Sequence, residues 1–169
     1  MTFQIGEKVV YPNQGVGTIE NISSREFGAQ FEKFYLLRLT YTSMTVMVPF
    51  SNVDNIGLRK VCKTNEISRI LTFLATGTCR TSSDWKCRFK ENMDKMQSGS
   101  LILAAEVLKT LLILQRDKPL SFREKKMLDR ARHMLVTEIS IARGIPVAET
   151  IDILQKALKK ANLALPPVL

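Results

Sequence analysis

The sequence has few of the residues that build catalytic and metal centres. Its 169 residues include one histidine and three cysteines. A single histidine excludes multi-histidine metal centres and most catalytic triads. Cys62, Cys79 and Cys87 are odd in number and irregularly spaced, which argues against a disulfide framework and is typical of a reducing compartment. With His133 they are four possible zinc ligands, but none of them form a close-spaced pair, so we expect no metal site.

The sequence also lacks the features of membrane and secreted proteins. No apolar run approaches the roughly 18 residues that a transmembrane helix needs. Residues 1–7 contain neither a basic nor an apolar region of the kind that begins a secretory signal. We therefore expect a cytoplasmic protein that does not enter a membrane.

Features that carry catalysis are absent as well. The acidic residues are scattered singly among basic ones, without a pair suited to acid–base chemistry. Gly15-Val16-Gly17 lies between strand-like residues with no helix after it, which indicates a turn rather than a phosphate-binding loop. Cys87 lies between Lys86 and Arg88 but has no histidine near it in the sequence. We predict that the chain is not an enzyme and holds no cofactor.

What the chain does have is an uneven positive charge. The formal net charge is +9, and residues 1–60 hold 6 basic and 5 acidic residues, whereas residues 61–169 hold 19 basic and 11 acidic residues. The second part therefore carries +8 of the total. An excess of this kind on one folded unit is typical of a protein that binds a polyanion, most often nucleic acid.

The first sixty residues have the pattern of short antiparallel strands. Apolar and polar residues alternate, β-branched and aromatic residues are frequent, and Gly, Pro, Asn and Ser separate the runs. Five strands in so short a segment predict a Tudor-like or SH3-like small β-barrel. The expected strands are 8–11, 16–22, 31–40, 44–49 and 53–58.

From about residue 60 the apolar spacing becomes helical and stays so. Residues 101–115 are apolar on nearly all sides, which predicts a central buried helix. Thr64 is expected to cap the first helix, the second is expected to begin at Ser82 or Ser83, and Ser121 with Glu124 is expected to form a capping box. The prediction is an α+β protein with a β module in residues 1–60 and a bundle of about five helices in residues 61–169.

The segment 84–90 contains the only tryptophan, Trp85, together with three cations, Lys86, Arg88 and Lys90. One interpretation is that Trp85 packs on Phe89 and begins the apolar stripe of its helix. The other is that the indole meets DNA bases while the cations meet phosphates. The sequence leaves both open.

A basic face on the later helix has the same ambiguity. Its members are Arg123, Lys125, Lys126, Arg130 and Arg132. Long helices usually present charges to water, so this face is either a solvated surface or a surface for the DNA backbone. The net charge of the second part favours DNA.

A set of motifs runs along the chain at residues 3–17, 48–49, 56–59, 84–85, 88–92 and 120–128. Together these motifs resemble the CarD/CdnL family of bacterial transcription regulators, essentially from end to end. The opening motif alone is also shared with the polymerase-binding module of transcription-repair coupling factors, but the tryptophan helix and the capping-box helix together are specific to CarD-like proteins.

The resemblance implies how the two parts act. The Tudor-like module would dock on the β-subunit lobe of RNA polymerase, with Arg25 helping to hold it. The helical part would touch promoter DNA at the upstream edge of the melted region, with Trp85 wedged into the minor groove and Arg88, Lys90 and Lys125 near the backbone. The family often has arginine where this chain has Met47 and Cys87.

The resulting hypothesis is a monomeric regulator that binds the RNA polymerase β subunit through Arg25 and Met47. Two alternatives stay open at this point: a free-standing, nonspecific double-stranded DNA-binding protein, and a Tudor-like adaptor that binds only protein, with Trp85 in its core. The predicted DNA-binding residues are Trp85, Lys86, Arg88, Lys90, Lys125 and Lys126.

Overall fold

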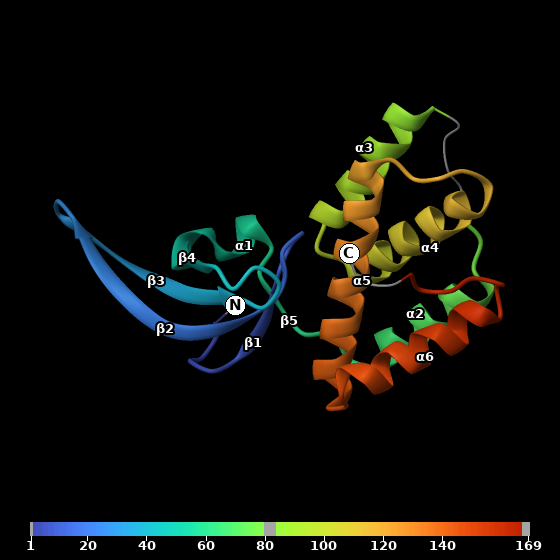
Figure 1. Ribbon diagram of the computed structural model, residues 1–169. Coiled ribbons are helices and arrows are strands. Elements are labelled where there is room, and N and C mark those ends of the chain that lie inside the picture. The colour runs from blue at the N-terminus through green and yellow to red at the C-terminus, as the bar shows by residue number, and fades with distance from the viewer. Residues whose placement is uncertain (1, 80–83, 167–169) are drawn as a thin grey trace. The chain divides into compact units, whose positions relative to one another are not determined.

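The computed structural model describes residues 2–79 and 84–166, and the chain divides into two compact units, Met1–Val61 and Cys62–Leu169. The first unit is built on an antiparallel sheet and the second is helical (Figure 1). The predicted α+β class is therefore confirmed. Among the described residues, no helix has the length and apolar character to span a membrane.

The five strands of the sheet are Lys8–Tyr11 (β1), Gly15–Phe27 (β2), Gln30–Leu39 (β3), Thr45–Pro49 (β4) and Arg59–Lys60 (β5). Their order in the sheet is β4-β3-β2-β1-β5. The β2 and β3 strands form a long hairpin that extends well beyond their neighbours (Figure 1). Gly15, at the turn into β2, has a φ of 89°, the left-handed region that glycine adopts without steric cost.

The strand predicted over residues 53–58 is wrong. This segment contains a 3₁₀ turn, η1 (Phe50–Asn52), followed by a short helix, α1 (Val53–Ile56), and the fifth strand is β5. Val53 and Ile56 are three residues apart, which places both on one side of a helical turn against the core of the sheet. Gly57 ends the turn with a φ of 84°.

Within the described residues, the second unit contains five helices: α2 (Thr64–Thr76), α3 (Trp85–Gln97), α4 (Leu101–Asp117), α5 (Phe122–Arg143) and α6 (Val147–Lys159). The central helix, α4, packs against α2, α3 and α5, and its Leu108 and Leu111 are fully buried, as its apolar sequence predicts. Leu135 and Ile139 of α5 complete this core.

The helix caps differ in part from the prediction. Ser121 caps α5 as expected, because its Oγ accepts the Glu124 N–H at 3.2 Å. Thr64 does not cap α2. Lys63 holds the cap position, and its carbonyl accepts from two backbone amides of the first turn. Ser82 and Ser83 lie outside the described residues, and α3 is capped by Asp84.

A buried lysine closes the end of α2. Lys109 of α4 is 3% exposed, and its Nζ donates to the carbonyls of Phe73 at 2.8 Å and Gly77 at 2.6 Å. Burial lowers the pKa of this amine. Gly77 is needed here because a Cβ atom would lie 2.2 Å from the Phe73 ring.

We expect Lys109→Met to destabilise the protein by roughly 2 kcal/mol, because the chain length is kept while the buried carbonyls lose a charged donor. Urea unfolding of the full chain measures the change, with the exposed Lys159→Met as the matched control. Equal stabilities for the two variants would contradict the structural role of Lys109.

Candidate nucleic-acid interface

Trp85 lies at the first position of α3 and is 55% exposed. The Asp84 carboxylate accepts the Lys86 N–H at 3.2 Å and so begins the helix just before the indole. The apolar stripe begins one turn later, with Phe89 partly buried and Met96 almost fully buried. The interpretation of Trp85 as a core residue is therefore wrong, because the helix starts before it reaches the packed part of the bundle.

A second exposed aromatic opens α5. Phe122 directly follows the cap residue Ser121 and is 70% exposed. Sequence reasoning missed it. The available signal was its position, because Phe122 does not belong to the inward stripe that Leu128, Ala131 and Leu135 form on the same helix.

The starts of α3 and α5 are linked to each other twice. Arg88 of α3 forms an ion pair with Glu124 of α5, with 3.3 Å between Nε and Oε2, and the two side chains are only 14% and 8% exposed. In the opposite direction, the Arg123 guanidinium of α5 lies 5.5 Å from the ring centre of Phe89 in α3. We call these two linked segments, residues 85–90 of α3 and 122–126 of α5, the paired helix starts.

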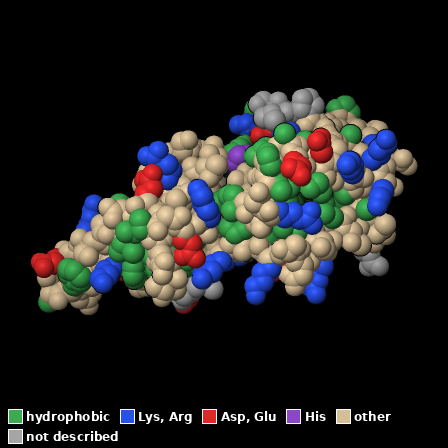
Figure 2. Space-filling model, turned by 90° about the horizontal axis from the view of Figure 1, so that it is seen from below, with side chains coloured by type: hydrophobic (Ala, Val, Ile, Leu, Met, Phe, Trp, Pro, Cys, Tyr) green, Lys and Arg blue, Asp and Glu red, His purple; other side chains and the backbone are tan. Residues whose placement is uncertain are grey.

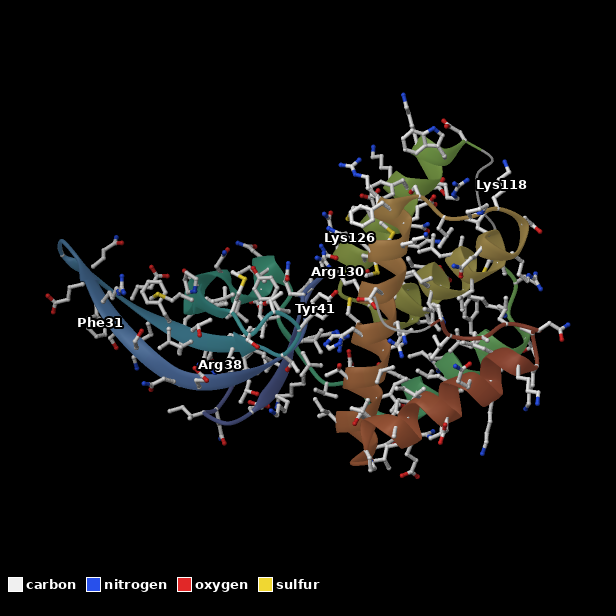
Figure 3. All side chains as sticks on the ribbon, viewed as in Figure 1. Phe31, Arg38, Tyr41, Lys118, Lys126 and Arg130 are labelled. Atoms are coloured by element: carbon white, nitrogen blue, oxygen red, sulfur yellow. The ribbon has the colours of Figure 1, made fainter. Side chains whose placement is uncertain are left out.

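A lysine lies over each of the two exposed aromatic rings. The Nζ of Lys86 lies 6.0 Å from the Trp85 ring centre, and the Nζ of Lys126 lies 4.6 Å from that of Phe122. Lys126 and Arg130 follow one turn apart on α5 (Figure 3). The exposed cations on the paired helix starts are Lys86, Lys90, Arg123, Lys125 and Lys126.

Of the six residues predicted to bind DNA, Arg88 is placed differently from the rest. Trp85, Lys86, Lys90, Lys125 and Lys126 are exposed, whereas Arg88 is mostly buried in its pair with Glu124. Of the predicted basic face, Arg130 and Arg132 are half-buried. The structure thus brings the predicted set together around one edge of the helical unit but assigns Arg88 a contact within the protein.

Positive charge alone does not locate the interface. On the face shown in Figure 2, lysine and arginine side chains lie at several places around the helical unit, with hydrophobic surface between them. Within the described residues of this unit, Trp85, Phe122 and Val147 are the exposed large hydrophobic residues. The paired helix starts are distinguished by aromatic and basic side chains together.

In the first unit, strand register places Arg25 and Met47 on one face of the sheet. Arg25 of β2 pairs with Glu32 of β3, and Met47 of β4 pairs with Leu36. These positions alternate with the core residues Tyr35 and Leu37 and so lie on the opposite face. Both side chains are exposed, Met47 by 38%, and β4 is an edge strand.

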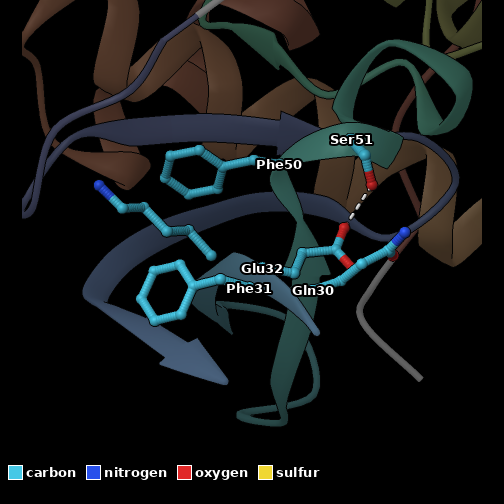
Figure 4. Close-up of a pocket in the computed structure, with 6 residues that line it drawn as sticks. Gln30, Phe31, Glu32, Phe50 and Ser51 are labelled. Atoms are coloured by element: carbon cyan, nitrogen blue, oxygen red, sulfur yellow. Dashed lines mark hydrogen bonds between the residues drawn. The ribbon is translucent and has the colours of Figure 1, made fainter. Parts of the chain in front are cut away.

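A shallow groove of about 600 Å³ follows the edge of β3 beyond the end of β4. Figure 4 shows Phe31 and Phe50 lining it, with Ser51 donating a hydrogen bond to Glu32. Phe31 is 62% exposed. This edge of the sheet therefore offers apolar contacts next to the face that carries Arg25.

The cysteines differ in burial: Cys62 is buried, whereas Cys87 is exposed. Within the part of the chain that the structure describes, no group of three or more Cys, His, Asp and Glu side chains is arranged to hold a metal ion. Burial lowers the pKa of His133, and the nearby Asp129 opposes this shift.

Two models of protein families match this chain. The model of the CarD C-terminal domain matches residues 69–155, and the model of the CarD-like/TRCF RID domain matches residues 3–62. YdeB of Bacillus subtilis, whose name describes it as a candidate transcription factor, is 36% identical over 143 residues, covering 85% of this chain and 94% of YdeB. The chain belongs to the CarD-like family. Family membership suggests transcription regulation through RNA polymerase.

Two solved structures are similar to part of this CarD-like chain. CdnLNt from Myxococcus xanthus is 39% identical, with a TM-score of 0.31, and the match covers 36% of this chain and 86% of that one. The solution structure of the N-terminal domain of Myxococcus xanthus CarD is also 39% identical, with a TM-score of 0.30 and coverages of 35% and 79%.

Proposed function

We propose that this CarD-like protein docks on the β-subunit lobe of RNA polymerase and stabilises the promoter open complex from the upstream edge of the bubble. The observation that carries this proposal is the exposed indole of Trp85 on a basic edge of the helical unit. The protein acts as a monomer at the nucleoid, in the cytoplasm. The direct test is the lifetime of open complexes with and without the full chain.

Trp85 acts on opened DNA. An indole that fills the gap beside unstacked bases gains contact area only after the bases have separated, so it favours the open state over the closed one. Stacking of a base on an aromatic side chain is worth roughly 1–3 kcal/mol. Arg88 contributes through its ion pair with Glu124, which holds the first turn of α3 in place.

The exposed lysines bind phosphates without reading sequence. Lys86, Lys90, Lys125 and Lys126 are separate, solvent-exposed charges, so their DNA affinity is weak and decreases with salt. The departure at Cys87, which is exposed, leaves one cation fewer beside the indole. Placement at the promoter must therefore come from the polymerase, which raises the effective concentration of the helical unit near DNA.

The first unit supplies that placement. Arg25 and Met47 lie on one exposed face, and the edge strand β4 offers backbone groups for pairing with a strand of the β lobe. With Met47 in place of the arginine common in the family, this part of the contact is apolar. Arg25 then carries the main electrostatic part of the docking.

For DNA binding, we expect Lys90→Gln to reduce the affinity of the full chain by a similar factor on every sequence. The slope of log affinity against log salt should become shallower by about one, because one phosphate contact is lost. Fluorescence anisotropy with two unrelated duplexes measures both quantities. Lys156→Gln is the matched control, because Lys156 is also exposed but lies on α6.

Two outcomes would contradict this prediction. A strong preference of the unaltered chain for one duplex at physiological salt would show base reading instead of phosphate contacts. Equal salt slopes for the Lys90 and Lys156 variants would show that DNA affinity depends on the net charge of the chain and not on lysines at the paired helix starts.

A further inference from the structure

Phe122 is exposed in a place where the fold does not need an aromatic residue. It is 70% exposed at the first position of α5, while the core contacts of that helix begin with Met127 and Leu128. The cap of α5 is made by Ser121 and Glu124 and does not involve the ring. A single exposed apolar side chain is ordinary on a protein surface, so the surroundings of Phe122 decide what it can contact.

The surroundings of Phe122 repeat those of Trp85. In each case a cap residue, Asp84 or Ser121, accepts a backbone N–H of the first turn, and the next residue is an exposed aromatic. A lysine ammonium lies over each ring, at 6.0 Å for Trp85 and at 4.6 Å for Phe122. The same chemistry is therefore presented twice.

The two aromatics are held on one structure. Arg88 follows Trp85 by one helical turn, and its partner Glu124 follows Phe122 by two residues. The ion pair between them is largely shielded from water, which makes it less sensitive to salt than a surface pair. Contacts within the protein thus hold together the two helix starts that carry the aromatic residues.

We infer that Phe122 and Lys126 form a second DNA contact, on the duplex next to the fork that Trp85 engages. The ring packs on deoxyribose and base edges in the minor groove, and the Lys126 ammonium meets the adjacent phosphate. This inference rests on the proposed function and adds to it a contact with paired DNA. The neighbouring cations Arg123 and Lys125 favour a polyanion over an apolar protein surface.

The two aromatic residues should respond differently to forked and to fully paired DNA. Trp85 gains its contact from unpaired bases, so Trp85→Ala should weaken binding to forked DNA more than binding to duplex. Phe122 contacts paired DNA, so Phe122→Ala should weaken binding to both probes by the same factor. We expect a loss of about fivefold, the lower end of the effect of an aromatic contact with DNA.

The experiment uses the full chain and two labelled probes of one sequence, a complete duplex and a duplex with one melted end. Fluorescence anisotropy is measured over a range of salt concentrations. Phe122→Ala should lower affinity without changing the salt slope, whereas Lys126→Gln should make the slope shallower by about one. Phe122→Tyr should keep most of the affinity, because it keeps the flat ring. The matched control is Phe31→Ala, which removes a similarly exposed ring from the first unit.

The outcomes separate this inference from the proposed function. If the unaltered chain binds neither probe, both are wrong. If it binds, and Trp85→Ala weakens binding while Phe122→Ala behaves like Phe31→Ala, only the second contact is wrong. A loss of polymerase binding on Phe122→Ala with unchanged DNA affinity would also overturn it and assign Phe122 to a protein surface. Thermal unfolding of each variant excludes a folding defect, and Phe122→Tyr provides a second, conservative test.

Discussion

Replacing Trp85 with alanine should shorten the lifetime of promoter open complexes by about five- to a hundredfold. The indole is more than half exposed and lies outside the core stripe of α3, so its removal leaves the packing of the bundle intact. Only the contact with unstacked bases is lost. Because this contact forms after melting, the closed complex keeps its affinity and the open complex decays faster.

Open-complex lifetime on one promoter measures this effect, with each variant at saturating concentration and its folding checked by circular dichroism. Trp85→Phe should restore part of the lifetime, since phenylalanine keeps a flat apolar face but loses area and the indole N–H. A folded Trp85→Ala protein that gives the unaltered lifetime would rule out the wedge.

For polymerase binding, Arg25→Glu should weaken affinity for the β subunit at least about tenfold. At the proposed interface, charge reversal would turn an attractive contact into a like-charge one, and position 47 has no arginine to compensate. Surface plasmon resonance of the full chain on immobilised β subunit measures this loss. Lys8→Glu is the matched control, because Lys8 pairs with Thr18, about 20 Å along β2 from Arg25.

The Arg25 variant should also lose its effect on open complexes at low protein concentration while keeping its DNA affinity. Equal binding of the Arg25 and Lys8 variants to the β subunit would contradict the docking face. Retention of full promoter activity without β-subunit binding would favour the free-standing DNA-binding alternative instead.

Much of the fold follows from local pattern. The alternation around Tyr35 and Leu37 predicts β3 because successive side chains of a strand point to opposite faces, and these two residues are buried as expected. The Ser121 cap and the uniformly apolar α4 are equally local, since each depends on residues within a few turns. Positive charge in the second half is a property of composition and needs no structure.

Other features depend on contacts between segments far apart in the sequence. Val53 and Ile56 form a helical turn because that spacing meets the core of the sheet, which a short apolar run does not reveal by itself. Arg88 reads as one more basic residue beside Trp85 until Glu124, thirty-six residues later, is found to pair with it.

The sequence by itself therefore determined the two-part organisation, most of the helices and strands, and which half is basic. The reason is that periodicity depends on neighbouring residues and charge depends on composition alone. Only the tertiary structure decided that Trp85 is exposed. It also decided that the helix start carrying Phe122 is linked to the helix start carrying Trp85. The physical reason is that exposure depends on which other helices cover a residue. In this protein, the core contacts of α3 begin with Phe89, one turn after Trp85, and those of α5 begin after Phe122.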